Sequence, residues 1–532
     1  MTSISAVNPT LQTALLPVST TPPVQSDAGA SATTGTPTPA SVVILGENTS
    51  IGYAETYTSR GAVTGSESKV VQESEGYNKV TYAMLGNLDS SSANTRFRGV
   101  GAALMQQLAE GKSTSFSQSL LKASASNSPS AITSAQSDLH NKSANTFSLT
   151  LKMASGATVT LSLAGGSRGL AVSADVSGGK LSSEELSALG DLADSFQGAI
   201  DGLSAVPPSL KLGDLAKLDP NMFSSVDLSS SLKLDEDTTQ TFSFHADSVS
   251  KSLSLVGPNG NIALTVDTKN AAILGNKEQQ AKALTAYLDQ FDEARKRGEG
   301  DDNLMSLFKT AFTDLNGFNS PVAAAGGATQ RLNAMTLNDV DHGMLTGLAD
   351  FTASIGQPQS RPNPMHLDEI DKFTYNVSQN SVTKGTSQQN RSLEQNQQSS
   401  LSAAFHKNLY PGSTLELTSE KKSQNYYYTE IEDKASTTTK LAYEKGSLVE
   451  ASLSQSATQT TRTRKYVMGE LESDIYTPKE VTKSKNMLGM IEAALQRDRD
   501  SRQMSGKSTL LDDMKELHSK ILLQPNPSLI RD

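Results

Sequence analysis

The chain has 532 residues, of which 36% are hydrophobic and 19% charged, and its formal net charge is −10. This charge argues against a dedicated nucleic-acid binder, because neutralising phosphates requires clustered Lys and Arg. The complete absence of Cys excludes disulfides, thiolate catalysis and Cys-based metal sites.

Residues 1–40 contain TTPPVQSDAGASATTGTPTP, which cannot bury enough apolar surface to offset the entropy of ordering it. We therefore expect a disordered Ser/Thr/Pro-rich tail. No secretory signal peptide is predicted, and no stretch approaches the roughly 18 apolar residues of a transmembrane helix. Residues 41–144 give a mixed signal, in which SVVILG is typical of a buried strand, GAALMQQL of a helix and ASASNSPSAITSAQS of a loop.

The clearest pattern lies in residues 145–317, which we expect to form an α+β core unit. Apolar residues alternate at 147–153 and 159–163, which predicts a β-hairpin turning at Ser155-Gly156, and they alternate again at 170–176. A second hairpin is expected over residues 253–266, across a Gly-Pro-Asn-Gly turn.

Three amphipathic helices are expected in the same unit, at residues 182–203, 276–298 and 301–317. The first begins with a complete capping box, formed by Ser182 and Glu185. The fold class is therefore α+β, with antiparallel hairpins packed against amphipathic helices.

Two similar tripeptides suggest an internal duplication in this unit. Thr146-Phe147-Ser148 and Thr241-Phe242-Ser243 each open a passage that reads strand, hairpin, helix, which suggests a repeated ββα unit. The alternative is that Thr, Phe and Ser are simply good strand residues.

The C-terminal part is more polar. Residues 318–365 are expected to form a linker with a short helix, and residues 366–483 polar antiparallel strands separated by SQQNRSLEQNQQSS and SQSATQTTRTRK. Disorder or helix stays open for this region, because its strands would bury little. Residues 484–532 are expected to form a helical hairpin that turns at Ser505-Gly506.

One serine lies in a literal nucleophile-elbow motif. Gly165-Gly166-Ser167-Arg168-Gly169 matches GxSxG, which exposes a catalytic serine at a strand-to-helix turn. Because this motif joins two alternating strands, a Gly-rich hairpin turn explains it, and the presence of His245 downstream adds little.

Three glycine-containing segments resemble parts of nucleotide-binding motifs. Gly111-Lys112-Ser113 and Gly506-Lys507-Ser508 lack the earlier Gly of a phosphate loop and are better interpreted as helix-ending turns. Residues 98–104 have Leu104 where a dinucleotide fingerprint requires Gly or Ala, and no apolar strand precedes them.

The remaining candidates favour structural interpretations. Asp339, Asp341 and His342 do not fit a calcium loop, because Val340 and His342 would occupy ligand positions. Asp301-Asp302 fits a helix N-terminus, Asp235-Glu236-Asp237 lies at an element boundary, and a strand would divide Tyr426-Tyr427-Tyr428 between two faces. No HExxH motif is formed by the six histidines, His140, His245, His342, His366, His406 and His518.

Residues 178–203 (GGKLSSEELSALGDLADSFQGAIDGL) and 284–312 (LTAYLDQFDEARKRGEGDDNLMSLFKTAF) resemble uncharacterised bacterial proteins, some of which carry a lactate dehydrogenase label. The resemblance covers about the central third of the chain and implies no catalytic residue, because no nucleotide-binding βαβ unit accompanies it. The uncharged, Ser/Thr-rich N-terminus is also similar in composition to flagellar and type III export substrates.

We therefore expect a non-enzymatic structural or interaction protein with an unidentified protein partner, and no catalytic residue, cofactor or metal ligand is assigned. Two alternatives stay open: an enzyme whose site is assembled from scattered residues, and a cytoplasmic regulator of an assembly or export machine. The expected location is the cytoplasm, or outside it by a route that requires no cleaved signal peptide.

Overall fold

The computed structural model describes residues 43–44, 68–74, 76–90, 92–124, 127–217, 219–317, 337–410 and 412–530. The tail expected over residues 1–40 and the Ala/Gly-rich linker at 321–328 lie outside these ranges. Residues 41–532 belong to one compact unit.

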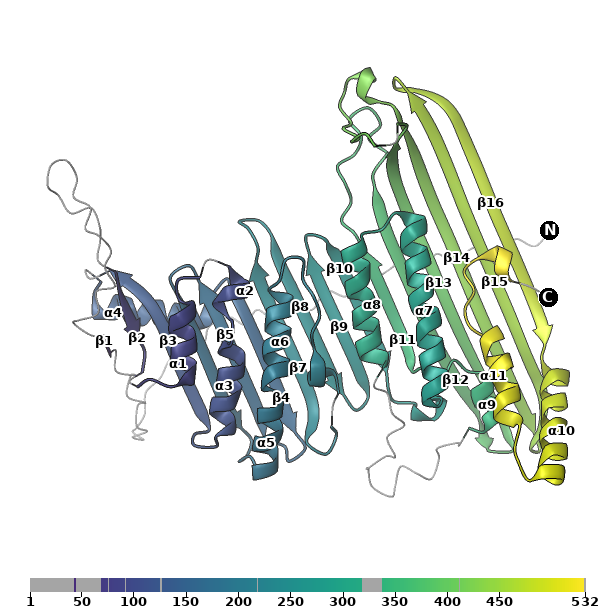
Figure 1. The fold of residues 1–532 in the computed structure, drawn as a ribbon, viewed down its shortest axis with the longest axis horizontal. Helices are drawn as coiled ribbons and strands as arrows, with labels where there is room; N and C mark the ends of the chain where they lie inside the picture. Colours follow the sequence, from purple (N-terminus) through teal and green to yellow (C-terminus); the bar gives the residue numbers. More distant parts are fainter. Residues whose placement is uncertain are drawn as a thin grey trace, which may run out of the picture. The chain divides into compact units, whose positions relative to one another are not determined.

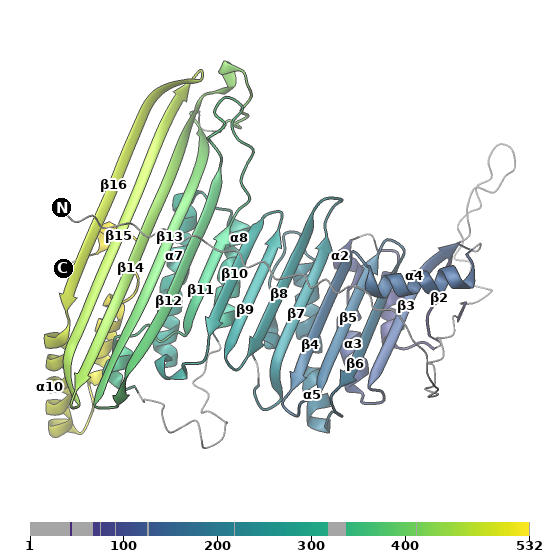
Figure 2. The same cartoon turned by 180° about the vertical axis from the view of Figure 1, so that it is seen from behind.

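The described strands form one sheet in which each neighbouring pair is antiparallel (Figures 1 and 2). The strand order is β1-β2-β3-β6-β5-β4, followed by β7 to β16 in chain order. The first eleven strands are β1 (Val43–Ile44), β2 (Ser68–Gln72), β3 (Ser115–Ser124), β4 (Asn145–Met153), β5 (Thr158–Gly166), β6 (Gly169–Ser177), β7 (Phe223–Lys233), β8 (Thr239–Asp247), β9 (Ser250–Gly257), β10 (Gly260–Asp267) and β11 (Asp350–Gly356).

The last five strands are much longer than the others and extend past the helices that cover the sheet (Figure 1). Their lengths run from 16 to 21 residues, against a usual strand of about 5–6 residues. These strands are β12 (Lys372–Ser387), β13 (Asn390–Asn408), β14 (Tyr426–Glu444), β15 (Ser447–Val467) and β16 (Glu470–Asn486).

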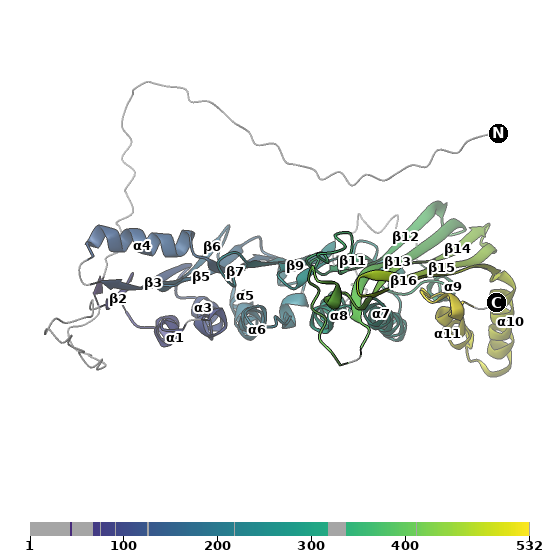
Figure 3. The same cartoon turned by 90° about the horizontal axis from the view of Figure 1, so that it is seen from above.

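The helices divide between the two faces of the sheet. Figure 3 shows α1, α3, α6, α7 and α8 on one face and α4 (Pro129–Asn141) on the other. We call the first the helix face and the second the open face. The other helices are α1 (Lys79–Asn87), α2 (Ala93–Arg96), α3 (Val100–Ala109), α5 (Ser183–Asp191), α6 (Ala193–Leu203), α7 (Lys277–Gly298), α8 (Asp302–Asn316), α9 (Asp339–Gly343), α10 (Leu488–Ser505) and α11 (Leu510–Lys520).

The main core lies between the helix face and its helices. Alternation puts every second strand residue there, so β4 buries Phe147, Leu149 and Leu151. Toward the long strands, aromatic rings pack edge to face, and the ring centres of Tyr287 and Phe351 lie 5.1 Å apart. Among the described residues, the open face has a small apolar cluster beneath α4 and a tyrosine cluster on β14 and β15.

The capping signals of the central unit are confirmed. Ser182 and Glu185 form both hydrogen bonds of the capping box, and Asn276 and Gln279 form a second one. Asp301 caps α8 by accepting a hydrogen bond from the Leu304 N–H. Both predicted hairpins, the strand over 170–176 and the C-terminal helical hairpin are also present.

Three predictions about local structure were wrong. The Ser-rich segment expected to be a loop contains α4, because Ser128 caps the helix and Pro129 occupies its first turn. The helix expected over 182–203 is two helices, α5 and α6, separated at Leu192. The linker expected over residues 318–365 has the predicted short helix, α9, but it also contains β11, whose alternating Phe351, Ala353 and Ile355 are buried in the core.

The long polar segments between the predicted C-terminal strands are themselves strand. SQQNRSLEQNQQSS lies mostly in β13 and SQSATQTTRTRK lies in β15. Their polar side chains include buried ones, because Gln395 and Gln397 are fully inaccessible on the helix face. Gln397 donates to the Ile521 carbonyl at 2.8 Å and accepts from the Leu523 N–H at 2.9 Å. These backbone partners replace the water that the buried amide loses.

Thr146-Phe147-Ser148 lies in β4 and Thr241-Phe242-Ser243 in β8. Each tripeptide opens a passage of three consecutive strands followed by two helices, so the units are longer than the ββα unit suggested above. A duplication stays a prediction.

Candidate interaction surface

The open face of the sheet carries a continuous row of small polar residues. Seven serines lie opposite one another on successive strands from β3 to β9, and the strand pairing aligns them across the sheet. In spatial order they are Ser117, Ser173, Ser162, Ser148, Ser229, Ser243 and Ser254. We call this the serine row.

The serine row continues in register to the far edge of the sheet, across β10 to β16. Its further members are Ala263, Ser354, Asn376, Ser400, Lys434, Thr458 and Glu480. Each member is exposed or half-buried, and on the strands before β16 its neighbours along the strand are mostly buried.

A second row runs beside the first, two residues away along each strand. Its members are Ser115, Asp175, Thr160, Thr150, Asp227, His245, Ser252, Thr265, Thr352, Ser378, Gln398, Ser436, Ser456 and Thr482. Neighbouring strands are about 4.8 Å apart, and two residues along a strand span roughly 6.7 Å. Except at Ala263, the two rows therefore present polar side chains at regular spacing in both directions.

The two rows form the floor of a groove over β10 to β15. The groove has a volume of about 540 Å³ and is lined by Thr, Ser, Asn, Gln and Lys residues together with the apolar residues Ala263, Leu264, Ala353, Val377 and Ala435. Within the described part of the chain, no hydrogen bond involves the side chains of Thr352, Ser378, Gln398 or Ser436, and Lys434 forms no ion pair there. The hydrogen-bonding capacity of these five side chains is therefore directed to solvent or to a ligand, whereas Asn376 donates to Ser400 and Ser456 shares a hydrogen bond with Thr482.

α4 borders the serine row at the other end of the sheet. Ile132 and Leu139 of this helix belong to the same apolar cluster as Ala164 and Ala171 of the open face. Ala164 is two residues from Ser162 on the same face of β5. The helix therefore covers the sheet beside the serine row.

His245 is the one histidine in the two rows. Its Nδ1 atom lies 2.6 Å from Oδ1 of Asp227, and its Nε2 atom lies 3.3 Å from Oδ2 of Asp247. The hydrogen bond with Asp227 raises the pKa of His245 despite partial burial. With a carboxylate against each ring nitrogen, the imidazole is best suited to an ion pair and has no free nitrogen with which to activate a serine.

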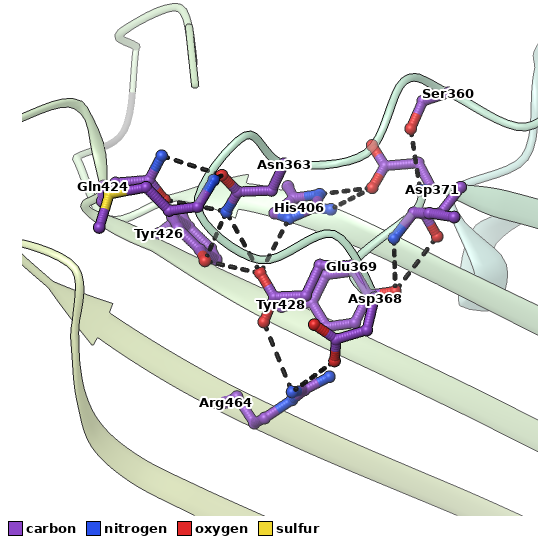
Figure 4. A network of polar contacts seen from close by, with 12 residues as sticks. Ser360, Asn363, Asp368, Glu369, Asp371, His406, Gln424, Tyr426, Tyr428 and Arg464 are labelled. Atoms are coloured by element: carbon purple, nitrogen blue, oxygen red, sulfur yellow. Dashed lines mark hydrogen bonds and ion pairs between the residues drawn. The ribbon is translucent and has the colours of Figure 1, made fainter. Parts of the chain in front are cut away.

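A buried polar network fixes a loop onto the open face of the long strands (Figure 4). Residues 357–371, between β11 and β12, supply Asn363, Glu369 and Asp371. The strands supply His406 from β13, Tyr426 and Tyr428 from β14, and Arg464 and Tyr466 from β15. We call these eight residues the loop clamp. Tyr428 is six residues from Lys434 on the same strand, which places the clamp on the open face roughly 20 Å from the groove.

Glu369 is the centre of the loop clamp. Its side chain is fully buried, and its Oε2 atom accepts hydrogen bonds from Tyr426 at 2.6 Å and from Asn363 at 3.4 Å. Burial raises the pKa of Glu369, but hydrogen bonds from His406, Tyr426 and Tyr466, with the charge of Arg464, outweigh burial and lower the pKa to about 2. Glu369 is therefore a carboxylate.

His406 connects the two acidic residues of the loop. Its Nδ1 atom lies 2.6 Å from Oδ1 of Asp371 and its Nε2 atom 3.3 Å from Oε2 of Glu369. Burial lowers the pKa of His406, and the two carboxylates raise it further than burial lowers it. Imidazolium is the form that donates to both carboxylates at once.

Carboxylates, imidazole and phenols are also the groups of general acid–base catalysis. Here, however, the side chains of Glu369 and His406 are 0% and 6% exposed. Their polar atoms mostly bond one another, while Oε1 of Glu369 and Nε of Arg464 have no hydrogen-bond partner among the described residues. The arrangement therefore fixes the loop, and a substrate would have to displace it to reach these groups.

The acidic cluster of Asp339, Asp341 and His342 lies in the short helix α9. Asp341 is fully buried in α9, where it forms an ion pair with Arg391 at 2.6 Å and accepts a hydrogen bond from Tyr443 at 2.8 Å. The guanidinium of Arg391 also lies 3.9 Å from the centre of the Tyr443 ring. Among the described residues, no group of His, Asp and Glu has metal-binding geometry.

The structure places the other sequence candidates at turns and helix ends. Ser167 lies in the two-residue turn between β5 and β6, which confirms the hairpin interpretation, and no contact joins it to His245 in the described chain. Gly111-Lys112-Ser113 follows α3, and Gly506-Lys507-Ser508 separates α10 from α11. Residues 98–104 begin α3 after another helix, α2, and Asp235-Glu236-Asp237 joins β7 to β8.

The tyrosine triplet is divided between the two faces, as predicted. Tyr426 and Tyr428 are buried in the loop clamp, whereas Tyr427 faces the other side. The sequence analysis identified neither the loop clamp nor the two rows. Alternating Ser and Thr within single strands indicated polar residues on one face. The alignment of these residues into rows across the sheet depends on the strand order, which the sequence did not reveal.

No family model, curated protein or solved structure matches this chain. None of the described helices is long and apolar enough to cross a membrane.

Proposed function

We propose that this chain is a non-enzymatic structural or interaction protein that binds an extended partner through the open face of its sheet. The observation that carries the proposal is the pair of polar rows, which remains solvent-facing across fourteen strands from β3 to β16. A sheet that needed no partner on this face would tolerate any polar side chain there. Instead, small hydroxyl residues recur at the same register on strands far apart in the sequence.

The test uses the absence of Cys in the chain, because a single introduced thiol then reports on one position. Ser243→Cys places a thiol in the serine row, and Ser306→Cys is the matched control at an exposed position of α8. The rate of maleimide labelling is measured for both variants in the native setting, which is the intact producing cells or their culture medium. It is measured again on the purified proteins.

We expect Ser243→Cys to react more slowly in the native setting than in the purified protein, while Ser306→Cys reacts equally in both. Slower labelling of both variants would indicate general inaccessibility and would contradict the proposal. Equal labelling of Ser243→Cys in both settings would contradict it as well, because the open face would then have no partner.

A further inference from the structure

We propose that the groove over β10 to β15 binds a neutral, extended β-1,4-linked glycan chain that runs across the strands. This inference rests on the proposed function and names the class of partner. It follows from the direction of the groove, its chemistry and its flatness.

The groove runs perpendicular to the strands. Its lining residues come in two parallel series, from Ala263 to Thr458 in one row and from Thr265 to Ser456 in the other. A ligand that contacts each of these strands in the same way has to present groups at the strand spacing, about 4.8 Å. Successive rings of an extended β-1,4-linked glycan advance by nearly this distance, so each ring would meet one strand.

The chemistry of the floor fits a polyhydroxylated ligand. Hydroxyl and amide side chains both donate and accept hydrogen bonds, as sugar hydroxyls do. The lining side chains include Thr352, Ser378, Asn376 and Gln398, and Lys434 is their single charged group. A floor with so little charge matches a neutral polymer and offers little attraction to a polyanion.

A folded protein fits this floor less well. Energetically important residues at protein interfaces are enriched in Trp, Tyr and Arg, and neither row contains any of the three. A slender chain also avoids α4, which lies on the same face over β3, β5 and β6 (Figure 3), and the loop clamp, which lies on that face of β13 to β15, roughly 20 Å along the strands from the groove. Affinity would come from many weak hydrogen bonds made by successive units.

The first experiment measures binding of the full chain to soluble cello-oligosaccharides by calorimetry. The affinity is expected to rise with each sugar from the trimer to the hexamer, because the groove spans six strands. Coiled α-1,4-linked maltohexaose is the comparison and is expected to bind at least tenfold more weakly. No binding of cellohexaose at millimolar concentration, or equal binding of both hexamers, would overturn the proposal.

The second experiment changes the floor. The triple variant Thr265→Val, Thr352→Val, Ser378→Val removes three hydroxyls while keeping strand-forming side chains. Each lost neutral hydrogen bond weakens binding roughly fivefold, so cellohexaose affinity should fall more than tenfold. The control Thr429→Val, Thr463→Val makes the same change on the helix face of β14 and β15 and should leave the affinity unchanged.

Lys434→Met distinguishes a neutral from an anionic ligand. A neutral glycan predicts little change in this variant, whereas binding of polygalacturonate that is lost with Lys434→Met would overturn the neutral assignment. Self-association of the purified chain that blocks the groove, seen by ultracentrifugation, would also overturn it. Protection of Ser243→Cys in cells without any glycan binding would reject the glycan and leave the proposed function intact.

Discussion

Residue His406 forms two hydrogen bonds with the carboxylate of Asp371, one through its imidazole and one through its backbone N–H. Oδ1 of Asp371 lies 2.6 Å from the ring Nδ1 atom and also accepts a hydrogen bond from the backbone N–H of His406 at 3.1 Å. A loop residue is thereby fixed to a strand residue 35 positions away in the sequence. This pair links the loop to β13, and the neighbouring Glu369 links it to β14 and β15.

Glu369→Gln should destabilise the protein by about 3 kcal/mol, since removing one partner of a buried ion pair leaves the other charge uncompensated. His406 would lose a carboxylate, and Tyr426 would lose its charged acceptor. Urea unfolding measures the change in the free energy of unfolding. Glu432→Gln, on the exposed part of the same sheet face, is the control and should change it by less than about 0.5 kcal/mol. Similar effects of the two substitutions would show that the loop clamp contributes little.

The loop clamp should contribute most stability between about pH 4.5 and pH 6.5. The pKa of Glu369 is lowered from 4.5 to about 2, so its contribution is present above pH 4.5 and is lost as the pH falls through about 2. The pKa of His406 is raised from 6.5, so its contribution is present below pH 6.5 and is lost as the pH rises through the raised value.

The pH prediction is checked by thermal unfolding of the wild type and His406→Gln across the pH range. The difference in Tm between the two proteins should be largest near pH 6 and should shrink at alkaline pH. A difference that grew with rising pH would mean that the neutral imidazole is the favoured form in the folded protein.

The buried pair of Asp341 and Arg391 gives a separate prediction. Asp341→Asn should cost about 3–5 kcal/mol, because Arg391 would remain buried without a charged partner. The double variant Asp341→Leu, Arg391→Met should recover most of this loss, since an apolar pair requires no desolvation of charge. Urea unfolding of the three proteins provides the measurement. A double variant that is less stable than Asp341→Asn would indicate that Tyr443 also depends on the ion pair.

Pro478 is expected to protect the free edge of β16 from pairing with other strands. Met487 donates its N–H to Ala451 of β15 at 2.8 Å, and donors alternate along an antiparallel strand. Pro478, nine residues earlier, therefore occupies a position whose N–H would point outward from the edge. A proline there removes an edge donor, a common protection against aggregation.

Pro478→Thr should therefore increase concentration-dependent association of the chain, measured by light scattering. The control is Thr477→Val, because the N–H of Thr477 points toward β15 and the free edge is unchanged. Equal scattering from wild type and Pro478→Thr would show that the charged side chains of β16 suffice to protect the edge.

Export without a cleaved signal remains a proposal that fractionation can test. If the chain leaves the cell by a flagellar or type III route, it should appear outside producing cells and be retained in a mutant of that apparatus. Its presence only in the cytosol of both strains would reject export. The absence of Cys is the feature of the sequence that motivates the experiment.

The sequence by itself determined the local elements of the central unit. Capping at Ser182 and Asn276 and the alternation around Phe147 depend on residues a few positions apart, so they can be recognised without knowledge of the fold. The same reasoning failed at β13, because the sequence alone predicts that the polar side chains of Gln395 and Gln397 face solvent. They are buried only because distant groups satisfy their amides. Gln397 bonds the Ile521 carbonyl and the Leu523 N–H, and Gln395 bonds the Thr346 N–H and the Ser381 hydroxyl.

Only the tertiary structure decided the surface and the loop clamp. Ser117 and Ser254 belong to one row because the strand order brings β3 and β9 into the same sheet, and nothing within a single strand specifies that order. Glu369 and Arg464, almost a hundred positions apart, meet because the loop between β11 and β12 folds onto the open face of β15. Alternation along a strand fixes which face a side chain occupies, whereas its neighbours across the sheet depend on the complete set of strand partners.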